Sequence, residues 1–364
     1  MNINKKIMLF FLVAAVSMLG LAACGSSSSD DSSGSSDSYS VTRTNDGAYS
    51  VDVFAMDTTM NIKAYGGSKA KKAVSDAAEE LYKLDSELSV VRETSPVYRL
   101  NSRETDTVSG DAAEVLKESL EMAEATGGAF DPTIYPIVKA WGFTTGEYRV
   151  PDEEEISSLL QHVGYEKVSL SEDQDGKTKV SFSDPETQID TGAIGKGYAS
   201  QVIQDMFKEE GVESAIATLG GNVMTVGSKT GGESWVIAVE NPEDTSSYAG
   251  YIKIKDEFAV TSGGYQRYFE EDGKKYIHIM DPSTGYPVDN DLSSVTIISD
   301  SGTEADALST ALYVMGLDGA ENFWRTSNLD FGIILIDNNG KIYVSEDIAD
   351  RFWVDSGSFE TIKK

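Results

Sequence analysis

Strand-like segments follow one another through the second half of the chain without regular helices between them. Alternating or continuous apolar residues predict strands within 178–184, 214–227, 234–242, 250–264, 293–300 and 331–345. A doubly wound fold alternates strands with helices, whereas an α+β fold groups its strands in runs. The order of these segments therefore predicts an α+β fold.

Helical periodicity is confined to a few segments. Apolar residues recur every three or four positions over 69–88 and 111–126, and a pair of glycines follows the second segment. Both segments are predicted to be helices that face the core. A third helix is predicted within 151–164, which begins with a proline and a run of acidic residues. Its His162 is predicted to be a partly buried structural residue.

The first 23 residues have the pattern of a secretory signal, with two lysines, an apolar run and small residues before Cys24. Cys24 is the only cysteine in the chain, so no disulfide can form within it. Residues 24–45 are rich in Ser, Gly and Asp and are predicted to be a flexible tether. The folded domain is therefore expected over residues 46–364, in one large domain or two closely joined lobes.

The chain is strongly acidic, with a formal net charge of −30 at pH 7. This charge repels phosphate backbones, so nucleic acid is not an expected partner. Most of the acidic residues are predicted to form a solvated surface. A polyanionic ligand would then need a metal ion or backbone amides to hold it.

The segment QIDTGAIGKGYAS, residues 188–200, passes from a short strand through three glycines into a helix. Glycines at such a junction let a ligand approach the backbone, and a helix start offers amides to an anion. The spacing is neither the dinucleotide fingerprint nor a P-loop. A packing or capping role for the glycines carries equal weight.

Asp306 and Thr310 lie four residues apart near a predicted helix start and so present two oxygen ligands on one face. Magnesium binds through one or two carboxylates, keeps water ligands and completes its shell with substrate phosphates. The alternative is structural. Thr303 followed by Asp306 resembles a capping box, and Thr310 can bond back to a carbonyl one turn earlier.

His278 is one of only two histidines and precedes an Asp281-Pro282 turn. The turn itself needs only proline and the glycine that follows, so His278 can simply end a short strand. The rest of the sequence decides between this and a functional role.

Eight segments together resemble the ApbE family of FAD:protein FMN transferases, over nearly all of residues 46–360. In chain order they are MDTTMNIKAYG, LSVVRETSPVYRLN, TGGAFDPTIYPIVKAWGF, IDTGAIGKGYA, ATLGGNVMTVG, TSGGYQRYF, HIMDPSTGYP and ADALSTAL. The resemblance implies an α+β fold with mostly antiparallel sheets, packed helices and an active site in a cleft between two intimately joined lobes. It implies an enzyme that moves FMN from FAD to a Thr or Ser of a partner protein with an FMN-binding domain, releasing AMP.

The resemblance also implies the site residues. The expected Mg²⁺ ligands are Asp306 and Thr310, with Ser309 adjacent and the backbone carbonyl of Ala193 opposite. FAD, the substrate, would be bound by a set that carries over by position, namely Met56, Ala129, Phe130, Asp131, Asp190, Lys196 and Met280. His278 and Asp306 would be catalytic, and Asp281 and Thr284 would shape the loop after His278.

Two positions depart from the family pattern. Val91 stands where many relatives place an aromatic residue against the flavin, and Asp57 replaces the usual glycine. The LAAC segment that ends at Cys24 resembles the lipobox of bacterial lipoproteins, which implies lipidation of Cys24 and an extracytoplasmic protein anchored to the cell membrane. Two alternatives stay open: an FAD diphosphatase that uses water as the acceptor, and a flavin-binding lipoprotein without catalysis.

Overall fold

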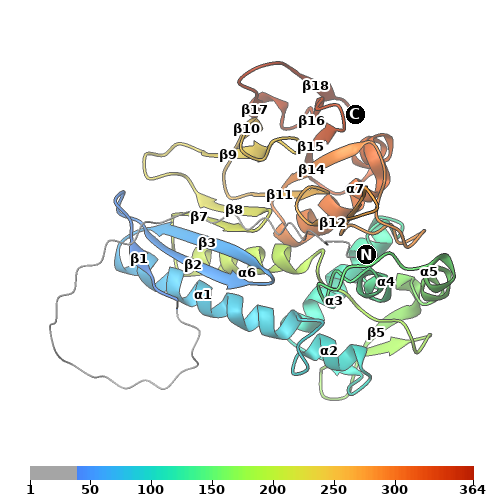
Figure 1. The fold of residues 1–364 in the computed structure, drawn as a ribbon. Coiled ribbons are helices and arrows are strands. Elements are labelled where there is room, and N and C mark those ends of the chain that lie inside the picture. Colours follow the sequence, from blue (N-terminus) through green and yellow to red (C-terminus); the bar gives the residue numbers. More distant parts are fainter. Residues whose placement is uncertain (1–38) are drawn as a thin grey trace, which may run out of the picture. The chain divides into compact units, whose positions relative to one another are not determined.

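A ten-stranded sheet organises residues 39–364, the part of the chain that the computed structural model describes (Figure 1). Its strand order is β1-β2-β3-β7-β8-β11-β14-β15-β16-β18. Every neighbouring pair is antiparallel except β16 and β18. The α+β fold with mostly antiparallel strands is thus confirmed.

The strands of this sheet are β1 (Thr42–Arg43), β2 (Tyr49–Ala55), β3 (Thr58–Tyr65), β7 (Ser214–Leu219), β8 (Asn222–Gly227), β11 (Phe258–Gly263), β14 (Leu292–Ser299), β15 (Gly332–Asp337), β16 (Ile342–Ser345) and β18 (Phe359–Ile362). The smaller sheets contain β9 (Trp235–Glu240), β10 (Tyr248–Ile254) and β17 (Phe352–Trp353); β4 (Thr107–Val108), β5 (Val168–Glu172) and β6 (Thr178–Phe182); and the hairpin of β12 (Tyr268–Glu271) and β13 (Lys274–Ile277).

The helices are α1 (Ser68–Leu88), α2 (Pro96–Asn101), α3 (Asp111–Ala125), α4 (Tyr135–Ala140), α5 (Glu153–Leu160), α6 (Gly195–Glu209) and α7 (Gly302–Thr326), with short 3₁₀ turns η1 (Tyr165–Lys167) and η2 (Ala349–Arg351). The three helices predicted from periodicity correspond to α1, α3 and α5 and are confirmed. None of the helices in the described range is long and apolar enough to cross a membrane.

The ten-stranded sheet is buried on both faces. Helices α1, α6 and α7 pack on one face (Figure 1), and the three-stranded sheet β9–β10–β17 packs on the other. Successive residues of β15 alternate between the two cores, so Ile333 and Leu335 face the helices while Ile334 and Ile336 face the small sheet. Burial on both sides explains why this strand is a continuous apolar run.

An aromatic cluster attaches the β12–β13 hairpin to the segment after α4. Phe269 stacks on Tyr148 and on Tyr276, with ring centroids 5.2 and 5.1 Å apart. Trp141 lies 5.3 Å from the Tyr276 ring and donates to the Gly285 carbonyl over 2.9 Å. The hairpin is thus held mainly by side-chain packing, because among residues 39–364 it pairs with no other sheet.

The described fold begins before residue 46. Tyr39 bonds to Glu79 of α1 over 3.0 Å, and β1 pairs with β2. Both features fall in the segment that was predicted to be a tether. Composition did not reveal them, because one aromatic contact and two paired residues change it very little. The signal segment, the lipobox and Cys24 lie outside the described residues. Residues 39–364 form one compact unit, so any lobes are closely joined.

Candidate active site

The start of α6 is fixed to α7 by a hydrogen bond to Asp306. The Gly197 N–H donates to Asp306 Oδ2 over 2.7 Å, and Asp306 is only 4% exposed. A Cβ on Gly197 would lie 2.3 Å from the Gly302 carbonyl oxygen and 2.5 Å from Asp306 Cβ. The two helix backbones therefore approach so closely that only glycine fits. Gly197 thus has the packing role considered above.

Gly197→Ala is expected to lower the free energy of unfolding by about 1–3 kcal/mol, as overpacking of a tight contact does. The added methyl group cannot be accommodated without moving α6 away from α7. Gly231→Ala is the matched control, because nothing lies within 4 Å of a Cβ at Gly231. Urea denaturation of both variants measures the effect, and equal stability of the two would contradict the close contact.

Two more amides at this helix start are bonded within the protein. The N–H groups of Ile194 and Gly195 both donate to the Thr191 carbonyl, over 3.3 and 2.8 Å. Together with Gly197, three amides are thus bound within the protein. These three are not free for an anion, whereas within residues 39–364 no hydrogen bond involves the N–H groups of Ala193 and Lys196, which the glycine-rich segment can still offer to a ligand.

Three hydroxyl side chains, those of Ser262, Ser309 and Thr310, lie together beside Asp306. Ser262 Oγ is 2.7 Å from Ser309 Oγ and 3.4 Å from Thr310 Oγ1. Ser309 donates its proton to the Asp306 carbonyl over 2.8 Å, so Ser262 is the donor to Ser309. Ser309 is fully buried by these bonds, whereas Thr310 is half-buried. Thr310 is therefore the more accessible oxygen of the two.

The capping alternative for Asp306 is not what the structure contains. The Ser301 hydroxyl caps α7 by accepting the Glu304 N–H over 3.2 Å. The Asp306 carboxylate instead accepts a hydrogen bond from the Gly197 N–H of α6. This bond uses Oδ2 and leaves the second carboxylate oxygen, Oδ1, available.

Oxygen atoms suited to a hard cation remain at this point. Within residues 39–364, no hydrogen bond reaches Asp306 Oδ1 or the Ala193 carbonyl oxygen. With the Thr310 hydroxyl, these are the ligand types that magnesium prefers. The described residues include no cluster of three or more His, Cys, Asp or Glu side chains that could hold a metal. The donors fit an ion that keeps waters and binds substrate phosphates, rather than one enclosed by protein.

A second group of polar residues surrounds His278. Burial lowers the pKa of His278 to about 4, and the charges of Lys196 and Arg267 add to the lowering. Burial also raises the pKa of Asp190, while the same two cations oppose the rise. The charges of Lys196 and Arg267 thus act on both His278 and Asp190. Because Lys196 precedes Gly197, the group adjoins the contact between α6 and α7.

The β12–β13 hairpin fixes the orientation of the His278 ring. Its main-chain N–H and its Nδ1 both lie 3.1 Å from the Arg267 carbonyl oxygen. A carbonyl only accepts hydrogen bonds, so Nδ1 carries a proton and Nε2 of the neutral ring is free to accept one. The Arg267 guanidinium donates to the Phe143 carbonyl. Arg267 was not among the residues predicted for the site.

Three of the residues expected to contact FAD point into the protein. Both carboxylate oxygens of Asp131 accept hydrogen bonds, of 2.6 to 2.9 Å, from neighbouring loops. Phe130 and Met280 are 3% and 5% exposed and pack in the core. These side chains hold loops in place, so a ligand here would contact main chain or the half-buried Ala129.

Met56 and Asp57 form the two-residue turn between β2 and β3. Their φ angles of 49° and 59° suit a type I′ hairpin turn. Aspartate tolerates this left-handed conformation, so the departure from glycine preserves the turn. Asp85 accepts the Met56 N–H over 2.8 Å and pairs with Arg92 over 2.8 Å. One carboxylate thus ties the turn to the loop that carries Val91, which is 56% exposed.

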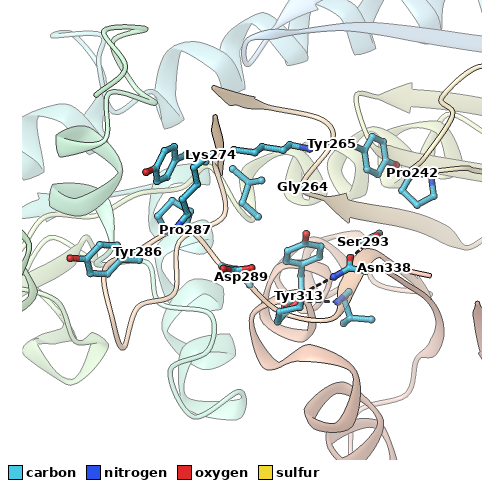
Figure 2. Close-up of a pocket in the computed structure, with 16 residues that line it drawn as sticks. Pro242, Gly264, Tyr265, Lys274, Tyr286, Pro287, Asp289, Ser293, Tyr313 and Asn338 are labelled. Carbon is cyan, nitrogen blue, oxygen red and sulfur yellow. Dashed lines mark hydrogen bonds between the residues drawn. The ribbon is translucent and has the colours of Figure 1, made fainter. Parts of the chain in front are cut away.

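A cavity of about 370 Å³ is lined by Ile277 and Tyr313, although none of the predicted site residues lines it. Figure 2 shows Tyr265 and Pro242 on one side, Tyr286 and Pro287 on the other, and Tyr313 rising from α7. Some of its lining residues are close in sequence to predicted site residues. Ile277 precedes His278, and Tyr313 follows Thr310 by one helical turn.

Comparisons with known proteins agree on one family. The model of the ApbE family matches residues 56–333. A Vibrio cholerae protein named FAD:protein FMN transferase is 35% identical over 72% of this chain and 79% of its own length. A Klebsiella pneumoniae protein of the same name is 32% identical over 85% of this chain and 96% of its own.

Solved structures are similar as well. The ApbE protein from Thermotoga maritima superposes with a TM-score of 0.76 at 32% identity, covering 84% of this chain and 99% of that one. The flavin transferase ApbE from Vibrio cholerae gives a TM-score of 0.71 at 28% identity, with 84% and 99% coverage.

Proposed function

The chain belongs to the ApbE family and is a flavin transferase, and we propose that it moves FMN from FAD to a Thr or Ser hydroxyl of a partner flavoprotein. In this reaction the hydroxyl oxygen attacks the FMN phosphorus, a new phosphoester bond forms, and the bond to AMP breaks. AMP leaves with the electron pair, and the hydroxyl proton passes to a base. The reaction needs positioning and charge stabilisation more than covalent participation of the protein.

The bond between Gly197 and Asp306 is the observation that carries this proposal. It fixes the Asp306 carboxylate of α7 to the residue after Lys196, and Lys196 is one of the two cations whose charge lowers the pKa of His278. Asp306 Oδ1, the Thr310 hydroxyl and the Ala193 carbonyl would hold Mg²⁺, which would neutralise and orient the pyrophosphate. The cations Lys196 and Arg267 would face the same phosphates.

His278 is the proposed general base. Its Nδ1 is committed to the Arg267 carbonyl, so Nε2 would take the proton of the acceptor hydroxyl. A ring with a pKa of about 4 is neutral at pH 7 and able to accept a proton, but it is a weak base. An anionic ligand that pairs with Lys196 and Arg267 removes two causes of the low pKa. Binding of FAD would therefore strengthen the base where it is needed.

The test is to incubate the purified protein with FAD, Mg²⁺ and a recombinant FMN-binding domain that carries one target threonine. We expect the domain to gain the mass of FMN and AMP to appear in equal amount. The Thr→Val form of the domain should gain nothing. Equal AMP release with and without the domain, and no labelling, would instead identify water as the acceptor and the protein as an FAD diphosphatase.

The proposed location is the outer side of the cell membrane, with the domain anchored through lipidated Cys24. Cys24→Ser is expected to leave the protein unlipidated, because the thiol is the only acylation point of this kind in the chain. Detergent-phase partitioning should fall while the activity of residues 39–364 is retained. Unchanged partitioning of the variant would contradict this anchor.

A further inference from the structure

The outer edge of β13 is free at the cavity beside His278. Residues Lys274–Ile277 all line this cavity. Successive side chains of a strand point to opposite sides, so four consecutive lining residues mean that the strand edge itself faces the cavity.

The register of the hairpin identifies which main-chain groups are free. His278 N–H bonds to the Arg267 carbonyl, so in an antiparallel pair Tyr276 and Lys274 are the next residues that bond to β12. The N–H and C=O groups of Lys275 and Ile277 then point away from β12. Within residues 39–364 no other group bonds to them.

Just after β13, at Ile279 and Met280, the same edge is already paired with another segment of the chain. The Val288 N–H donates to the Ile279 carbonyl over 2.9 Å, and Met280 pairs with Pro287. Beyond this point the two segments diverge, and the cavity opens between them. An extended segment that entered the cavity would continue an existing ladder rather than begin a new one.

Position and charge indicate what this segment is. The free edge ends next to His278, and Tyr313 of the opposite wall lies one turn beyond Thr310 on α7. Lys274 and Lys275 stand at the edge and take part in none of the ion pairs of residues 39–364. Glu271 and Glu270 lie opposite them across the hairpin, but neither glutamate lines the cavity. The two lysines therefore still attract an acidic chain there, which the net charge of −30 would otherwise repel. One carboxylate, Asp289, lies on the other wall.

Resting on the proposed function, we infer that an extended, acidic segment of the acceptor protein binds as a third strand along the free edge of β13. Main-chain bonds to Lys275 and Ile277 would hold it, and Lys274 and Lys275 would pair with its carboxylates. Its target hydroxyl would then lie beside His278, at the end of the edge.

Lys275→Pro tests the main-chain contact, because proline removes an outward N–H without breaking the bonds to β12. Lys275→Ala is the matched control for the lost charge. With the FMN-binding domain as acceptor, we expect the proline variant to have a KM for the domain about tenfold above that of the alanine variant, as loss of main-chain hydrogen bonds implies. The dissociation constant for FAD, measured by fluorescence, reports that the site is intact.

The double variant Lys274→Glu, Lys275→Glu tests the charge independently and covers the case in which proline prevents folding. It should raise the KM for the domain at least tenfold and reverse its dependence on salt. Lys117→Glu, at an exposed position of α3, should leave the KM at the wild-type value. A KM within twofold of wild type in both edge variants would overturn this surface. Failure of the wild-type enzyme to label the domain at all would overturn the proposed function itself, which is a different result.

Discussion

Asp306→Asn is expected to lower FAD turnover by about 10³-fold, because several kcal/mol of charge stabilisation are lost with the carboxylate. The amide oxygen of asparagine must face the Gly197 N–H that Asp306 now accepts. Its NH₂ group then points to the place of Oδ1, where it repels a cation. The variant should therefore lose turnover and Mg²⁺ dependence while α6 and α7 stay joined.

Stability separates this effect from damage to the fold. Asp306→Asn should change the free energy of unfolding by less than about 1 kcal/mol, whereas Asp306→Ala leaves the Gly197 N–H unpaired and should cost about 1–3 kcal/mol. Glu304→Gln, two residues earlier on α7, is the control and should turn over FAD normally. Wild-type rates in the asparagine variant, with the same Mg²⁺ titration curve, would refute the proposed ligand.

His278→Ala is expected to lower covalent FMN transfer by about 10²-fold or more, the usual loss when a general base is removed. FAD affinity should change little, because the ring contributes a proton acceptor rather than a phosphate contact. The measurement is in-gel flavin fluorescence of the acceptor domain, beside AMP release without it. The acidic limb of wild-type kcat/KM should lie near pH 4 to 5, since the free enzyme's His278 has a lowered pKa of about 4 and is active when deprotonated.

The second histidine provides the control. His162 bonds through Nδ1 to Asp184 over 2.8 Å, in the structural role expected for it. His162→Gln should transfer FMN at the wild-type rate. If His278→Ala also did so, or if its loss were entirely in FAD affinity, the proposed role as base would be wrong.

Periodicity alone predicted the main elements of this fold, because its central strands and long helices carry strong patterns. The continuous apolar run of β15 and the repeating apolar face of α1 correspond to their burial in the structure. The β2–β3 hairpin was not among the predicted strands, although residues alternate in burial along β3. Its turn, Met56-Asp57, lacks the glycine that usually marks such a hairpin.

The candidate site was harder to read from the sequence. Spacing along α7 placed Asp306 and Thr310 on one face, as the structure has them. Nothing local predicts that Asp306 bonds to Gly197, which lies more than a hundred residues away, or that Arg267 orients His278 across a hairpin. Such contacts depend on how the elements pack, which the local pattern of a single sequence does not record.

The contact between Gly197 and Gly302 makes one part of the site more rigid than the other. At these two glycines the backbones of α6 and α7 are in direct contact, so the helices cannot slide past one another. Lys196 and Asp306 therefore keep a fixed separation. His278 belongs instead to a two-stranded hairpin that rests on stacked aromatic rings. Any adjustment between the empty enzyme and a crowded ternary complex must therefore come from the His278 side.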